Sequence, residues 1–217
     1  MRKASTLFID ESGKSSLAEE ENQPFILTGV ILDDIEIPAV EGINKNDFKN
    51  ALGVKSNDDF KGDSKRKEMK QYPYRVMASY LFGWFGKELE RKDSIGQITA
   101  DSRKGGDHQL LKALHLCKEG HVPYATGYQE AVNQRVRAIC FAEKGFLSGG
   151  VEITDLISYV TFFRAKRMLS KVIPTGIGDV WNEIYKKGEF KNITGQIVRR
   201  FFGIKKGEVH KYLKNRS

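Results

Sequence analysis

The stretch Leu7-Phe8-Ile9-Asp10-Glu11-Ser12-Gly13 places two adjacent carboxylates at the end of an apolar run. The run from Ala4 to Asp10 predicts a first β-strand. A charge at the rim of a core strand is costly unless it is paired, hydrogen-bonded or bound to a cation. Because side chains alternate along a strand, we expect Asp10 to point inward and Glu11 to point away from it. Asp10 is therefore the first candidate for a functional site.

Two further acids occur in similar surroundings. Asp101 follows the apolar run Ile95–Ala100, and Asp155 lies within an apolar segment that is expected to be helical. Hard divalent cations prefer oxygen ligands, and acids that converge from separate elements can hold two ions for phosphoryl displacement. Asp10 and Asp101 would converge if their strands were neighbours. For each acid alone, a helix cap or a surface position remains the simpler interpretation.

Taken together, the acids predict a Mg²⁺ or Mn²⁺ site. Its expected ligands are Asp10, Asp101 and Asp155. Glu152 lies three residues before Asp155, so both side chains leave the same helical face, and Glu152 is a further metal-ligand candidate.

The periodicity of apolar residues predicts an α/β fold in which strands and helices alternate. The helix that contains Pro73 is expected to break or begin at that residue. Strands are predicted over 4–10, 25–32, 59–61, 94–100 and 136–141, and helices over 65–91, 105–117 and 150–172, with a short polar helical insertion over 39–57.

At 217 residues, the chain is long enough for one sizeable domain with a small appendage. We expect a domain over residues 1–173, because Pro174 must end the last long helix. Residues 174–217 are rich in glycine and in basic residues such as Arg199 and Arg200. They predict a basic helical extension that packs on the same domain and either binds a nucleic-acid backbone or is simply solvated.

Composition restricts the cellular setting. A hydrophobic fraction of 40% supports a real core, and no apolar run approaches the roughly 18 residues of a membrane span. The short apolar run at the N-terminus does not resemble a secretion signal. Two cysteines in the whole chain fit a reducing cytoplasm. The net charge of +8 favours a polyanionic partner such as nucleic acid, although spare lysines also serve solubility.

Three short motifs together resemble those of a known family. Phe8-Ile9-Asp10-Glu11-Ser12-Gly13 and the segment Glu152–Tyr159 resemble the two signatures of the domain-of-unknown-function 3800 family, whose members are small bacterial and phage-associated proteins. Asp59-Phe60-Lys61-Gly62 is similar to the family's acid-x-Lys-Gly motif. The resemblance spans roughly residues 5–172. It implies a ribonuclease H-like fold, with a central mixed five-stranded sheet flanked by helices.

The resemblance also implies an activity. It assigns a metal-dependent nuclease site to Asp10, Asp101 and Asp155, with Asp59 or Glu11 as a fourth catalytic acid. Where the family usually has Gln-x-Ala-Asp, this chain has Glu152-Ile153-Thr154-Asp155, which adds a charge to the expected site.

Several basic residues are candidates for nucleic-acid binding. Arg103 and Lys104 are expected to contact phosphate, because the segment Arg103–Gly106 combines positive charge with free amides before a helix. Lys61 is a further candidate for a phosphate contact. A flexible turn is an equally good interpretation of that segment. Arg199 and Arg200 extend the same expectation to the C-terminal part.

Two other functions share these features. One is a non-catalytic nucleic-acid-binding or partner-binding module, such as one found in a phage-defence or mobile-element system. The other is a small-molecule phosphohydrolase, which would use the acids but would not need the basic surface.

Overall fold

The structure is a computed structural model, and it describes residues 3–14, 25–31, 36–43, 72–103, 106–121, 127–143 and 149–170. Three strands come first, and helices and strands are interspersed after them. In chain order they are β1 (Ala4–Ser12), β2 (Phe25–Ile31), β3 (Glu36–Ile43), α3 (Tyr72–Arg91), β4 (Ile95–Asp101), α4 (Gly106–Lys118), α5 (Tyr128–Arg135), β5 (Val136–Ala142) and α6 (Gly149–Ser170).

The strands form one mixed sheet in the order β3-β2-β1-β4-β5. The strand β1 lies in the middle, antiparallel to β2 and parallel to β4. The strand β2 is also antiparallel to β3, whereas β4 and β5 are parallel. The predicted α/β class, with a mixed sheet flanked by helices, is confirmed. Because β1 and β4 are parallel neighbours, their carboxyl ends lie at the same edge of the sheet.

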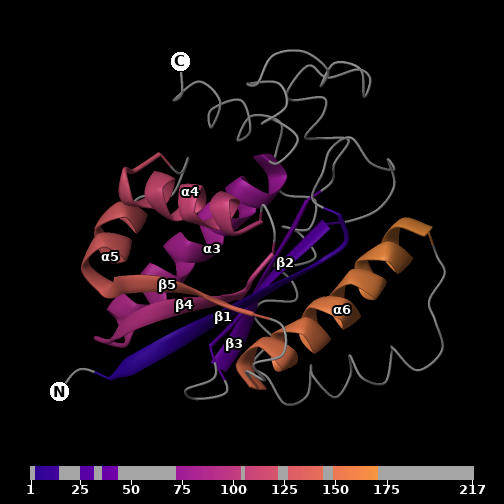
Figure 1. Cartoon of the computed structure of the whole chain (residues 1–217), viewed down its shortest axis with the longest axis horizontal. Coiled ribbons are helices and arrows are strands. Elements are labelled where there is room, and N and C mark those ends of the chain that lie inside the picture. Colours follow the sequence, from indigo (N-terminus) through magenta and orange to yellow (C-terminus); the bar gives the residue numbers. More distant parts are fainter. Residues whose placement is uncertain are drawn as a thin grey trace, which may run out of the picture.

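Helices cover both faces of the sheet. Among the described helices, Figure 1 shows α3, α4 and α5 on one side and α6 on the other. Side chains of β1 alternate between the two layers, because successive residues of a strand point to opposite faces. Leu7 and Ile9 join the core on the α3 side, whereas the ring of Phe8 lies against Gly150 of α6.

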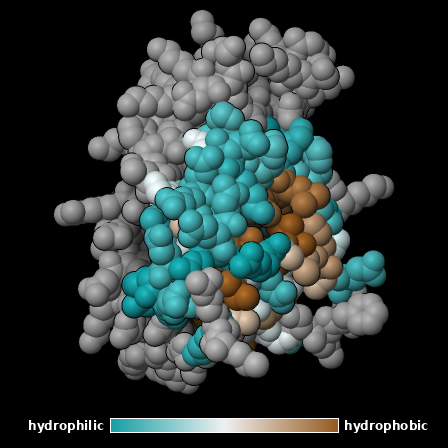
Figure 2. All heavy atoms as spheres, turned by 90° about the vertical axis from the view of Figure 1, so that its left-hand side faces the viewer, coloured by the Kyte–Doolittle hydropathy of each residue, from teal (hydrophilic) through white to brown (hydrophobic). Residues whose placement is uncertain are grey.

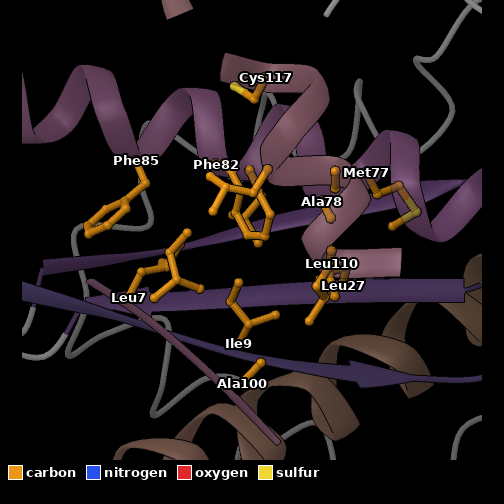
Figure 3. Close-up of a cluster of buried hydrophobic side chains, with 14 of the residues drawn as sticks. Leu7, Ile9, Leu27, Met77, Ala78, Phe82, Phe85, Ala100, Leu110 and Cys117 are labelled. Carbon is orange, nitrogen blue, oxygen red and sulfur yellow. The ribbon is translucent and has the colours of Figure 1, made fainter. Parts of the chain in front are cut away.

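The main core lies between the sheet and α3. Figure 3 shows Leu7 and Ile9 of β1 facing Ala78, Phe82 and Phe85 of α3. These α3 side chains are fully buried, which explains why this helix is apolar on most of its circumference. The helix therefore acts as the central support of the sheet.

A buried polar contact joins α3 to α4. Arg75 is 1% exposed, and its guanidinium donates two hydrogen bonds to Gln109 Oε1, at 2.8 and 3.1 Å. The Ser79 hydroxyl donates to the backbone oxygen of Arg75 in α3, at 2.8 Å, and its Oγ also lies 3.3 Å from the backbone oxygen of Ala113 in α4. Because a buried polar group must be hydrogen-bonded, these contacts restrict how α4 can sit on α3. They thereby help to position the start of α4.

Most predicted elements agree with the structure, but the third strand was misplaced. The residues of β3 overlap the predicted polar insertion over 39–57, so a helix there is wrong for the part that the structure describes. Pro38 and Gly42 lower the strand propensity of this segment, and both are tolerated because β3 is an edge strand. The strand predicted over 59–61 and the extension over 174–217 lie outside the described residues. Pro73 does mark the start of the long helix, since α3 begins at Tyr72.

The helix α5 was not predicted at all. It has eight residues, and only Ala131 and Val132 are buried, so it carries little hydrophobic periodicity. On the face of the molecule that includes α5, Figure 2 shows the described residues to be largely hydrophilic, with a smaller hydrophobic area beside them. Among the helices that the structure describes, none is long and apolar enough to span a bilayer.

The contact between α6 and β1 gives a stability prediction. A Cβ atom on Gly150 would overlap the ring of Phe8, whereas a Cβ on the neighbouring Gly149 would meet nothing within 4 Å. We expect Gly150→Ala to lower the free energy of unfolding by about 1–3 kcal/mol, the usual effect of overpacking. Gly149→Ala is the matched control and should not destabilise the protein. Urea denaturation monitored by circular dichroism measures both, and equal stabilities would contradict this packing of α6.

Candidate functional site

The register of β1 and β4 brings two of the predicted acids together. Ile9 pairs with Ala100, so Asp10 and Asp101 follow side by side at the carboxyl ends of the two strands. Asp10 is 2% exposed, and the side chain of Asp101 is 8% exposed. The condition for their convergence, that their strands be neighbours, is met.

The guanidinium of Arg103 lies among three carboxylates. Its Nη2 is 2.7 Å from Asp10 Oδ1, its Nη1 is 3.0 Å from Glu11 Oε1, and its Nε is 3.3 Å from Asp101 Oδ2. Although partial burial opposes the charge, these carboxylates raise the pKa of Arg103 above its ordinary value. The sequence predicted a phosphate contact for this residue. In the structure its guanidinium pairs with the acids at the ends of β1 and β4.

The backbone around Arg103 is held by Asp107 of α4. Asp107 Oδ1 accepts a hydrogen bond from the backbone N–H of Arg103, and Oδ2 accepts one from Ser102 Oγ, both at 2.8 Å. Ser102 N–H also donates to the backbone oxygen of Ala142 at the end of β5, at 2.7 Å. A carboxylate in the first turn of a helix is also favourable because it lies at the positive end of the helix dipole. These bonds aim the side chain of Arg103 at the strand ends.

Glu11 lies on the other side of β1 from Asp10, as strand alternation requires. Its Oε2 accepts a hydrogen bond from Tyr74 Oη of α3, at 3.2 Å. Burial, together with the Glu11 carboxylate, raises the pKa of Tyr74 well above its ordinary value, so the phenol stays protonated. Glu11 points away from Asp10, as expected, but both side chains contact Arg103 at the end of the strand. Tyr74 was missed, although its place directly after Pro73 at a helix start was a usable signal.

Asp155 approaches Asp10 from α6. The pKa of Asp10 is raised from 3.8 to about 7, first by burial and then by the nearby carboxyl group of Asp155, while Arg103 opposes the rise. Three sequence-predicted acids, from β1, β4 and α6, therefore lie at one edge of the sheet.

One buried oxygen of this cluster lacks a hydrogen bond within the described residues. Asp10 Oδ2 is buried and has no hydrogen-bond donor among the described residues. The neighbouring hydroxyl of Thr28, which pairs with Asp10 across β1 and β2, is also buried and has no partner in the same part of the chain. A buried carboxylate oxygen without a donor is the kind of atom that a cation satisfies.

The carboxylates fit Mg²⁺ or Mn²⁺ in chemistry, because both ions prefer oxygen ligands. Their arrangement is not that of a formed metal site. Within the ranges that the structure describes, no group of three or more His, Cys, Asp or Glu side chains is placed to hold a metal ion. Arg103 contacts Asp10, Glu11 and Asp101 instead. Asp155 and Glu152 are exposed on α6.

The remaining candidates cannot be placed. Asp59, Lys61, Lys104, Arg199 and Arg200 lie outside the described residues. Cys117 is buried in the core, and burial raises the pKa of its thiol to about 12, which fits a packing role.

Comparison of the sequence with models of known protein families finds no match, and a search of curated proteins finds none either.

Burial of Asp10 gives a pH-dependent prediction. An acid whose pKa is higher in the folded state than in the unfolded state contributes stability at low pH. That contribution is lost as the pH rises from 3.8 through about 7. We expect Asp10→Asn, which cannot ionise, to be more stable than the parent protein at pH 8 in the presence of a chelator, by at least about 1.4 kcal/mol, the equivalent of one pKa unit. At pH 5 the two proteins should differ less.

Urea denaturation across this pH range measures the effect. Glu119→Gln, which changes a 52% exposed side chain away from the cluster, should follow the parent at every pH. A variant Asp10→Asn that is less stable than the parent at pH 8 would show that the ion pair with Arg103 outweighs burial.

Proposed function

We propose that this protein is a metal-dependent nuclease that hydrolyses nucleic-acid phosphodiester bonds. The observation that carries the proposal is the convergence of Asp10, Asp101 and Asp155 at one sheet edge, with a buried Asp10 oxygen that lacks a donor in the described residues. An acid with a perturbed pKa that meets other acids at the end of a central strand is typical of a catalytic site.

The topology supports a ribonuclease H-like fold. The sheet order β3-β2-β1-β4-β5, with β2 antiparallel to its neighbours, is the arrangement expected of that fold. The acids lie on the central strand β1, on its parallel neighbour β4 and on the helix that covers the opposite face from α3. Together with the three motifs, this arrangement favours the domain-of-unknown-function 3800 family.

Each residue of the cluster has a role in this proposal. Asp10 and Asp101 would hold Mg²⁺ or Mn²⁺, with Asp155 completing the ligand set. The ion would supply positive charge against the phosphoryl oxygens as negative charge develops on them. Tyr74 holds Glu11 through its hydroxyl, and Arg103 is close enough to the acids to meet a phosphate there. The net charge of +8 favours a polyanionic substrate.

A second candidate is a non-catalytic module that binds nucleic acid. The placement of Arg103 favours it, because a guanidinium among Asp10, Glu11 and Asp101 compensates these acids without a metal ion. Such a module would bind nucleic acid in a salt-dependent manner, and its binding would survive the loss of Asp10. The two candidates therefore differ in what Asp10→Asn does.

The first test of the proposal is a nuclease assay. We expect the purified protein with Mn²⁺ to cleave at least one of single- and double-stranded DNA, RNA and the hybrid, and a chelator to stop the reaction. Asp10→Asn should lower cleavage by a factor of about 100 or more, because it removes a charged ligand. Glu119→Gln is the control and should retain full activity. Equal cleavage by Asp10→Asn and the parent would refute the proposal, and salt-dependent binding without cleavage would favour the second candidate.

The second test separates the two acids of α6. Asp155 is one of the groups that raise the pKa of Asp10, whereas Glu152 is not among them. We expect Asp155→Asn to lower the cleavage rate by about tenfold or more, and Glu152→Gln to change it by less than about threefold. Rates measured with saturating Mn²⁺ give the comparison. If Glu152→Gln has the larger effect, Glu152 is the ligand on this helix instead of Asp155.

A further inference from the structure

Arg103 contacts the same carboxylates that the proposed metal ions require. We propose that Arg103 is an internal competitor of the metal, whose guanidinium must leave the acids before a divalent cation binds and is then free to bind substrate phosphate. This inference rests on the proposed function and names a device within the same site. It predicts that the metal-free protein is held in an inactive arrangement by its own side chain.

The ion pairs of Arg103 place its guanidinium where it would repel a divalent cation at the same carboxylates. Asp10 Oδ1 and Asp101 Oδ2 are at 2.7 and 3.3 Å from nitrogens of the guanidinium. In the part of the chain that is described, Asp10 Oδ2 is the one oxygen of this carboxylate without a hydrogen-bond partner. A divalent cation at Asp10 Oδ2 would lie beside the guanidinium that is held on Oδ1 of the same carboxylate, and two like charges this close repel each other.

The structure allows Arg103 to move without unfolding the site. Its side chain is 36% exposed, so the guanidinium lies at the edge of the cluster and can reach solvent. Its backbone remains anchored to Asp107, and Glu11 keeps its hydrogen bond from Tyr74. Departure of the guanidinium therefore changes one side chain and leaves the acids in place.

A released Arg103 suits the substrate. The guanidinium has a planar set of donors that match phosphate oxygens, and it stays charged at any physiological pH. A phosphate bound by Arg103 would also draw the side chain away from Asp10 and Asp101. Metal and nucleic acid should thus strengthen each other's binding, because each favours the same position of Arg103.

Metal affinity tests the proposal directly. We expect Arg103→Gln to bind Mn²⁺ about tenfold or more tightly than the parent, because the competitor has been removed. The loss of the free Mn²⁺ signal in electron paramagnetic resonance measures this without any substrate. Arg91→Gln is the matched control, since it removes one exposed arginine that is paired with Glu88 on α3, and it should leave Mn²⁺ affinity unchanged. The same Arg103→Gln protein should bind a non-cleavable oligonucleotide more weakly than the parent when Mn²⁺ is saturating.

The outcomes separate the inference from the proposed function. If Arg103→Gln binds Mn²⁺ as the parent does, or more weakly, Arg103 is not a competitor, and the metal site still stands. If neither protein binds Mn²⁺ at millimolar concentration, the proposed function fails and the inference fails with it.

A measurement on the unmodified protein covers the case in which Arg103→Gln does not fold. The Nε–Hε resonance of Arg103 can be assigned by its absence from the spectrum of Arg103→Lys. We expect it to shift and to exchange faster with water when Mg²⁺ is added. A resonance that stays unchanged while the resonances of Asp10 respond to Mg²⁺ would overturn the proposal.

Discussion

Burial of a carboxylate at the end of the central strand is the constraint around which this site is organised. Asp10 is almost inaccessible to solvent, and a charge in that position must be neutralised, hydrogen-bonded or protonated. The structure provides two of these means. Arg103 supplies an opposite charge, and burial together with the nearby carboxyl group of Asp155 raises the pKa of Asp10 toward neutrality, which favours its protonation.

The fold delivers these partners from separate parts of the chain. Arg103 lies in the loop that follows β4. Because β4 is the parallel neighbour of β1 and ends at the same edge of the sheet, this loop brings Arg103 close to Asp10. The helix α6 brings Asp155 across the opposite face from α3, at a close approach that Gly150 permits beside Phe8. The well-packed core between β1 and α3 then fixes the strand end against which these groups meet. A site that includes a buried charge needs this rigidity, because a charge is tolerated only while its partners stay in place.

Local patterns were sufficient for the regular elements. The strands that became β1, β2, β4 and β5 are short apolar runs, and the helices α4 and α6 show a clear helical periodicity, so each was predicted to within a few residues. The strand β3 was mistaken for a helical insertion, because Pro38 and Gly42 interrupt its pattern and pairing with β2 overrides the weak local preference. The helix α5 was missed because it buries only two side chains.

The candidate acids were also visible in the sequence, since a carboxylate beside an apolar run is unusual wherever it occurs. What the sequence could not show was which groups neutralise them. Arg103 is separated from Asp10 by 93 residues and Tyr74 from Glu11 by 63, and no local pattern reports such a pairing. Strand pairing and helix packing decide it, because they set which side chains share a buried space. The sequence therefore established that Asp10 needs a partner, whereas the assembled sheet and helices made that partner an arginine from the β4–α4 connection and a second acid from α6.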